Sequence, residues 1–159
     1  SNFLTEHGIG SYEELLDRCE VASASAARLK ADLRDTGAKI DELALKMKHV
    51  AAYRQLKSIY DRYKASRDKE KFLRGHESEI ILFEAAAREC KRLGAVPLPA
   101  TERMQAEIDE LNARKAILKA ELQKAQRKEQ DYAAMRQNVE DFLSPPQPEQ
   151  ERKKNVELE

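Results

Sequence analysis

The sequence has little of what builds a thick globular core. It contains no Trp, 6% aromatic residues and only five Gly among 159 residues. Charged residues make up 36% of the chain, and such an Ala/Glu/Lys/Leu/Arg-rich composition is typical of long helices and coiled coils. Because apolar residues are few and regularly spaced, they can fill only a seam between helices. We therefore expect an all-α protein with a thin core.

Membrane spans and disulfide frameworks are also missing from the sequence. Cys19 and Cys90 are the two cysteines, and their wide separation fits no metal motif. We expect both to be small core residues in a reducing compartment. No apolar run approaches the ~20 residues of a membrane span and no signal peptide is present, which favours a cytoplasmic protein with no membrane partner. The chain does not begin with Met, so we expect it to be a fragment of a longer protein.

Sequence features of an active site are absent as well. The three histidines, His7, His49 and His76, are too far apart to form a short metal motif. There is no Gly-rich phosphate loop, no CxxC and no nucleophile paired with a base. We therefore predict no catalytic residue, no metal site, no cofactor and no enzymatic activity for this fragment.

A long helix is predicted from residue 11. Residues 1–10 are expected to end a preceding segment, with Gly8 as a helix stop, and Ser11 and Glu14 then form a capping-box pattern. Apolar residues follow at alternating spacings of four and three, which keeps one face of a helix against a partner. This first seam consists of Leu15, Cys19, Ala22, Ala26, Leu29, Leu33, Thr36, Ile40, Leu43, Met47 and Val50.

Beyond Val50 the apolar positions move to almost the opposite face of this helix. We expect the helix to continue to about residue 71 with a second partner on its other side, or alternatively to kink near His49. The second set of apolar positions is Leu45, Ala52, Leu56, Ile59 and Tyr63.

Two further helices are predicted. Gly75 is the first good helix breaker, so a short apolar helix is expected over 77–93, ended by Gly94. Pro97 and Pro99 place a loop at 95–100. A third helix is expected over 101–143, and the Pro-rich residues 144–159 are expected to be a disordered tail. The seam of the third helix is Met104, Ile108, Leu111, Lys115, Leu118, Leu122, Ala125, Glu129, Tyr132, Arg136, Val139 and Leu143.

The lengths and apolar faces of these predicted helices indicate how they pack together. Residues 15–50 and 104–143 are nearly equal in length and can pair antiparallel, while 77–93 can fold back along 51–71. The predicted fold of 11–143 is an elongated antiparallel coiled-coil hairpin, in which one long helix is packed by two shorter helices. A homodimer through the first seam is the alternative. The monomeric hairpin is favoured because the third helix supplies a local partner.

One stripe of cations and aromatic rings is the candidate site. The segment 53–76 has eight Lys/Arg against three Asp/Glu, a local charge of +5. Cations could neutralise DNA phosphates, each adding about −0.9 to the salt slope for duplex DNA, and exposed Tyr rings could stack on single-stranded bases. The alternative is a solvated charged face with Tyr rings packed on a neighbouring helix. On a continuous helix the stripe consists of Tyr53, Lys57, Tyr60, Lys64, Arg67, Lys71 and Arg74.

Four blocks of sequence carry a family resemblance, and the long middle block is not generated by heptad periodicity. They are YRQLKSIYDRY at 53–63, RDKEKFLRGHESEIILFEAAAREC at 67–90, NFLTEHGI at 2–9 and SYEELLDR at 11–18. Over about 1–143 the chain resembles the C-terminal region of bacterial relaxases, the mobilisation nucleases of plasmids and integrative elements.

The resemblance implies a function but no catalytic residue. Relaxases nick one strand at a transfer origin with a catalytic Tyr and a metal-binding His cluster in an N-terminal nuclease domain, and no residue here matches either motif. The resemblance therefore implies a non-catalytic helical domain that assists DNA binding or relaxosome assembly in conjugative mobilisation. Its partners would be origin-of-transfer DNA and accessory mobilisation or coupling proteins. The alternative is a structural spacer or protein-docking coiled coil with no DNA contact.

Overall fold

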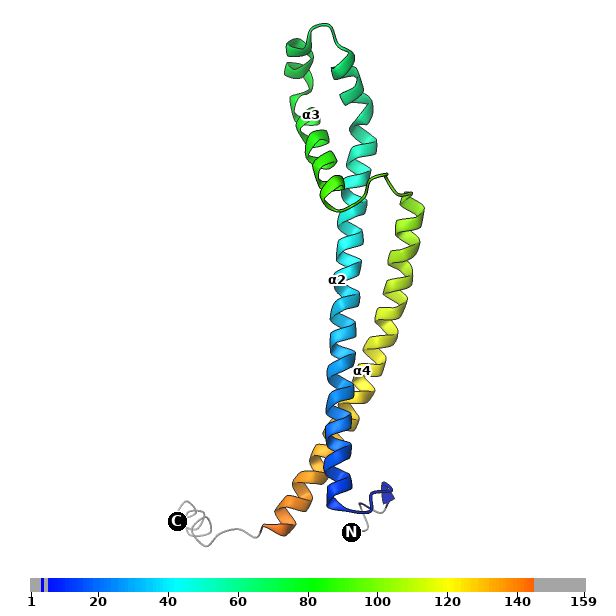
Figure 1. Cartoon of the computed structure of the whole chain (residues 1–159), viewed down its shortest axis with the longest axis vertical. Coiled ribbons are helices and arrows are strands. Elements are labelled where there is room, and N and C mark those ends of the chain that lie inside the picture. Colours follow the sequence, from blue (N-terminus) through cyan, green and yellow to red (C-terminus); the bar gives the residue numbers. More distant parts are fainter. Residues whose placement is uncertain (1–3, 5, 145–159) are drawn as a thin grey trace, which may run out of the picture. The chain divides into compact units, whose positions relative to one another are not determined.

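The described part of the protein is all-α. The computed structural model describes residue 4 and residues 6–144, and these contain three long helices and no strand (Figure 1). The helices are α2 (Tyr12–Ala65), α3 (Lys69–Arg92) and α4 (Thr101–Leu143). The bounds of α4 are those predicted, and the predicted loop at 95–100 is confirmed. The predicted disordered tail lies outside the described residues except for Ser144, whose N–H donates to the Glu140 carbonyl at 2.9 Å.

The predicted boundary between the first two helices is wrong. Helix α2 ends at Ala65 rather than near residue 71, and α3 begins at Lys69 rather than at 77. Asp68 is the reason, because its carboxylate accepts from the Lys71 N–H at 3.1 Å and so caps a new helix. Gly75 lies inside α3, and the break predicted there appears only as a kink at His76, with φ −137° and ψ 23°. The alternative kink near His49 is not present, since α2 is helical on both sides of it.

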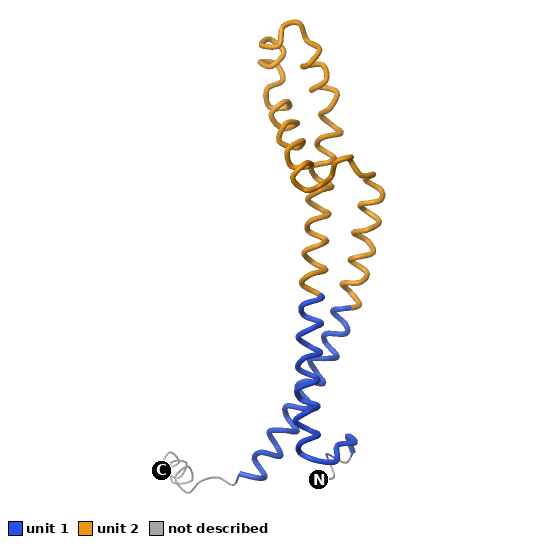
Figure 2. The backbone as a smooth tube through the Cα atoms, in the orientation of Figure 1, with its two compact units in different colours: residues 1–32, 118–159 blue, residues 33–117 orange. Residues whose placement is uncertain are grey.

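The chain divides into two compact units, coloured separately in Figure 2. Unit 1 comprises Ser1–Asp32 and Leu118–Glu159, and unit 2 comprises Leu33–Ile117. Both α2 and α4 contribute residues to each unit.

Unit 1 pairs the start of α2 with the end of α4. Its core is built on Ile9, Leu15 and Met135, which are all buried. The Tyr12 hydroxyl donates to Glu140 Oε1 at 3.0 Å, and Cys19 Sγ donates to the Tyr132 carbonyl at 3.4 Å. As the residue number increases along α2, the number of the contacting residue on α4 decreases. The two segments are therefore antiparallel within this unit. The seam prediction is wrong at Arg136 and Leu143, which are both exposed, while Met135 beside Arg136 is buried. The prediction of Cys19 as a core residue holds in part, since it is half-buried against this cluster.

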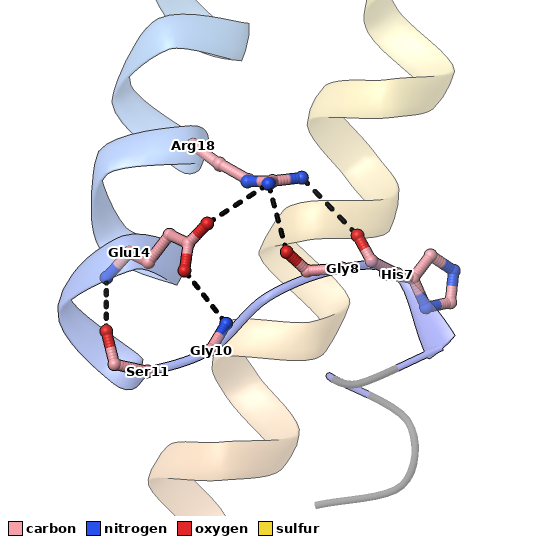
Figure 3. Close-up of polar contacts among 6 residues, drawn as sticks. All are labelled: His7, Gly8, Gly10, Ser11, Glu14 and Arg18. Carbon is pink, nitrogen blue, oxygen red and sulfur yellow. Dashed lines mark hydrogen bonds and ion pairs between the residues drawn. The ribbon is translucent and has the colours of Figure 1, made fainter.

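The segment before α2 is folded onto that helix by polar contacts (Figure 3). Gly8 takes a left-handed conformation, with φ +70°, and the Ile9 N–H donates to the Leu4 carbonyl at 2.8 Å. This geometry confirms Gly8 as a helix stop, because glycine carries no Cβ to clash at positive φ. The predicted capping box is confirmed in its first half, since Ser11 Oγ accepts from the Glu14 N–H at 3.1 Å.

The second half of the box is displaced by one residue and extended by an arginine. Glu14 Oε2 accepts from the Gly10 N–H at 2.8 Å. Arg18 donates to the carbonyls of His7 and Gly8, at 3.4 and 3.1 Å, and to Glu14 Oε1 at 3.1 Å (Figure 3). We call these contacts of Gly10, Glu14 and Arg18 the α2 clamp.

Unit 2 is built from the second half of α2, all of α3 and the start of α4. One buried cluster joins Val50, Cys90, Ala95 and Met104, which confirms Cys90 as a core residue. Beyond Val50, the predicted change of face is matched by contacts with α3, described below. Helix α3 ends as predicted at Gly94, with φ +71°, where the Ala95 N–H donates to the Cys90 carbonyl at 2.8 Å.

Candidate nucleic-acid interface

The predicted stripe is divided among three elements of unit 2. Its first four members, Tyr53 to Lys64, lie on α2, while Arg67 lies in the α2–α3 turn and Lys71 and Arg74 lie on α3. The prediction of a single helical stripe is therefore wrong, because it required one continuous helix through residues 53–74, and α2 ends at Ala65. The chain reverses direction at 66–68, so the later members lie on the helix that returns along α2 (Figure 1).

The tyrosine rings of the stripe are half-buried against α3. The rings of Tyr53 and Tyr60 lie 4.7 and 4.3 Å from the ring of Phe83, measured between centroids, and Phe83 is buried. Tyr63 lies between Tyr60, at 6.1 Å, and Phe72, at 6.2 Å. These contacts match the alternative expectation of Tyr rings packed on a neighbouring helix. Because aromatic pairs at these distances are attractive, the rings are held by α3 rather than presented to bases.

Three cations of α2 also have partners within the protein. Lys57 Nζ lies 3.0 Å from Asp61 Oδ2, and this hydrogen bond raises the pKa of the Lys57 ammonium. Lys64 Nζ lies 5.4 Å from the centroid of the Tyr60 ring, and Arg62 Cζ lies 5.5 Å from that of Phe72. Both distances are in the range of cation–π attraction, so these side chains lie over the aromatic rings.

The cations at the α2–α3 turn have no such partners. Their side chains are exposed, and none makes a hydrogen bond or ion pair with any residue that the structure describes. The carboxylate of Asp68 is engaged with the Lys71 N–H, and the positive end of the α3 dipole lies at the same place. We name this set the tip cluster: Arg67, Lys69, Lys71 and Arg74.

Sequence reasoning missed Lys69 and Arg54. Lys69 is off the four-three spacing, although a plain count of charge would have included it. Arg54 sits beside Tyr53 but has a structural role, since it donates to Thr101 Oγ1 at 2.9 Å and to the Pro99 carbonyl at 2.7 Å. It thereby ties the loop before α4 to α2.

A second cationic run on α4 was also missed. Residues 114–128 carry six Lys/Arg and one Asp/Glu, as the sequence alone shows. Within unit 1, Lys119, Lys124 and Arg127 of this run are exposed and have no partner among the residues described. They lie along one helix, without the turn that gathers the tip cluster.

His76 belongs to the aromatic contacts rather than to a metal site. Its ring stacks on Phe72 at 4.5 Å, and Nδ1 lies 3.6 Å from Glu79 Oε1. His76 lies inside α3, at the kink. In the part of the chain that the structure describes, no three His, Cys, Asp or Glu side chains are grouped to hold a metal ion. Over the same residues, the helices lack a stretch long and apolar enough to cross a membrane.

Comparison with known proteins identifies no relative. No family model matches the chain, and neither a curated protein nor a solved structure matches it. The class that the fold and the tip cluster define is an all-α protein with an exposed basic turn, and the resemblance to relaxases stays a prediction.

Proposed function

We propose that this chain is a non-catalytic helical domain of a relaxase, which assists DNA binding or relaxosome assembly in conjugative mobilisation. The observation that carries the proposal is the tip cluster, four exposed cations that have no side-chain partner among the described residues. Cations left free by the protein are available to phosphates. They also lie in the block at 67–90 that resembles relaxases.

The helices serve as the support for this turn. We propose the complete arrangement as an antiparallel coiled-coil hairpin, one long helix packed by two shorter ones, acting as a monomer in the bacterial cytoplasm. The antiparallel contacts of Tyr12 with Glu140 in unit 1, and of Tyr60 with Phe83 in unit 2, support this pairing. The proposed partners are origin-of-transfer DNA and accessory mobilisation or coupling proteins.

A second candidate function is a protein-docking coiled coil with no DNA contact. Ile81 and Leu82 on α3 favour it, because their side chains are 54% and 57% exposed although adjacent Ile80 and Phe83 are buried. Exposed apolar neighbours of this size often mark a protein contact. Changing both to Asp should abolish such docking and leave DNA affinity unchanged.

Fluorescence anisotropy tests the proposed function. A short labelled DNA duplex and its separate single strand are each titrated with the chain at low salt. At least one form should bind saturably and release as salt rises, because phosphate contacts displace counterions. Binding of neither form would refute the DNA function and leave the docking candidate. Light scattering on the same sample distinguishes the monomeric hairpin from a homodimer.

A further inference from the structure

We infer that the tip cluster binds the phosphate backbone of duplex DNA, in preference to a single strand and without base recognition. This inference rests on the proposed function and specifies the form of DNA that the site takes. It follows from which side chains are free at the turn and which are engaged.

The groups needed for single-strand binding are engaged. Proteins that hold single strands stack successive bases on exposed aromatic rings. Here Tyr53 and Tyr60 pack on buried Phe83, and Tyr63 packs between Tyr60 and Phe72. Each of these tyrosines is half-buried, so the contacts with α3 already cover part of its ring. The aromatic half of a single-strand site is therefore partly covered at this turn.

The remaining groups match the charge density of a duplex. Lys69, Lys71 and Arg74 lie on the first two turns of α3, where five residues rise ~7.5 Å. A duplex carries one phosphate per about 1.7 Å of axis, so this rise corresponds to about four phosphates, and a single strand offers about half as many. At ~100° per residue, Lys71 and Arg74 share one face of α3 while Lys69 lies on the opposite face, so a duplex on that face would meet these two cations together with Arg67 of the turn.

Residues 66–74 include no Asn or Gln, and Asp68 is occupied as the helix cap. The Arg and Lys side chains of the cluster could also donate to guanine, and we assign them to phosphates instead. Phosphate contacts position a protein on DNA but carry no direct sequence information. Two duplexes of equal length and unrelated sequence should therefore bind alike.

Salt dependence and charge reversal test the inference. Three phosphate contacts give a slope of log affinity against log salt of about −2.7, so a threefold rise in salt weakens duplex binding about 20-fold. We expect the duplex to bind more tightly than the strand at each salt concentration. Reversal of the cluster, K69E/K71E/R74E, should abolish duplex binding. Circular dichroism checks that the variants remain helical.

The α4 run supplies a matched control. The variant K119E/K124E/R127E changes the net charge by the same amount at exposed, partner-free positions, and it should keep wild-type affinity. Equal losses in the two triple variants would overturn the assignment to the tip cluster. Should K69E/K71E/R74E fail to fold, Lys71→Gln alone must make the salt slope less steep by about one unit.

Other outcomes separate this inference from the proposed function. Tighter binding of the single strand, weakened by Tyr60→Leu, would overturn the inference and leave the proposed function standing. Equal binding of vesicles containing anionic lipid would make the turn a general polyanion surface and also overturn the inference. Binding of neither DNA form would refute the DNA-binding part of the proposed function, and the inference with it.

Discussion

The starts of α2 and α3 contain similar residues, but their cations differ in whether they contact the rest of the protein. Each helix is capped by an acceptor side chain, Ser11 in one case and Asp68 in the other, and each has cations nearby. At the start of α2, the guanidinium of Arg18 is held by two backbone carbonyls and by Glu14. At the start of α3, no arginine contacts the Asp68 cap, and the side chains of the tip cluster have no partner among the described residues. Local charge alone therefore does not separate a structural cation from one available to a ligand.

The two units also differ in what fills their cores. Unit 1 is centred on the aliphatic side chains of Ile9, Leu15 and Met135, whereas aromatic rings meet around Phe83 in unit 2. Aromatic packing gives the α2–α3 turn a rigid support at its base. It also makes Phe83 the side chain on which that support most depends.

The largest expected effect is the loss of this ring. Phe83→Ala should lower the free energy of unfolding by about 3–5 kcal/mol, because it removes a buried ring and leaves a cavity beside Tyr53 and Tyr60. Urea unfolding followed by circular dichroism measures the change. Phe142→Ala is the control, since its side chain is 86% exposed and its loss should alter stability by less than about 0.5 kcal/mol. Similar effects of the two substitutions would show that the aromatic packing does not support unit 2.

Two glycine substitutions compare the effect of an added Cβ on stability at a helix end and inside a helix. Gly94→Ala should destabilise the protein by about 1–2 kcal/mol, because its φ of +71° is unfavourable for a residue with a Cβ. Gly37→Ala should instead stabilise it by up to ~1 kcal/mol, since Gly37 lies inside α2 and an added Cβ meets nothing within 4 Å. Thermal unfolding measures both changes, and the prediction fails if they have the same sign.

The two caps should differ in their tolerance of substitution. Asp68→Ala should cost about 1 kcal/mol, because the Lys71 N–H loses its acceptor. Ser11→Ala should cost less, because the contacts of Glu14 and Arg18 still hold the segment before α2. Chemical denaturation measures the difference, with Asp68→Asn as a conservative control. A larger loss for Ser11→Ala would contradict the proposed strength of the α2 clamp.

The smallest effect is a pH dependence confined to the α2 clamp. The Gly10 N–H, and after it Arg18, lowers the pKa of the Glu14 carboxyl. The stabilisation is therefore present above the ordinary glutamate pKa of about 4.3 and is lost as pH falls through the lowered value. An NMR titration of the Gly10 amide should show a midpoint below about 4.3. Arg18→Leu should move that midpoint upward, and an unchanged midpoint would remove Arg18 from the account.

Apolar spacing predicted the helices better than it predicted their boundaries. The first seam lies at positions that are all buried or half-buried, and the bounds of α4 were correct. The break at 66–68 contains neither Gly nor Pro, so the usual helix-breaking residues predicted a break at Gly75 instead. The available signal was the phase of the apolar pattern, because Tyr63 and Phe72 are nine residues apart, a spacing that no single helical face accommodates.

The candidate site was predicted in part for the same reason. Charge counting located the basic segment, since net charge does not depend on where a helix ends. The grouping of particular residues did depend on it, and the turn at 66–68 separated Tyr53 and Tyr60 from Lys71 and Arg74. Whether each ring or cation is engaged depends on contacts with α3, which spacing along α2 cannot show.

The contacts of Arg54 restrict the length of the loop before α4. Its guanidinium holds Pro99 and Thr101 at fixed points, so the six residues 95–100 must cover a set distance from the end of α3. An inserted residue in this loop would force a choice between the Arg54 contacts and the register of Met104 in its core cluster. The α2–α3 turn has local contacts, since the Ser66 hydroxyl donates to the Asp68 carbonyl at 3.1 Å and Phe72 contacts Arg62 and Tyr63. Among the described residues it has no link to a third helix, so we expect it to accept an added residue more readily. A reporter peptide or an added basic residue therefore belongs at 66–67, ahead of the Asp68 cap, and not in the proline loop.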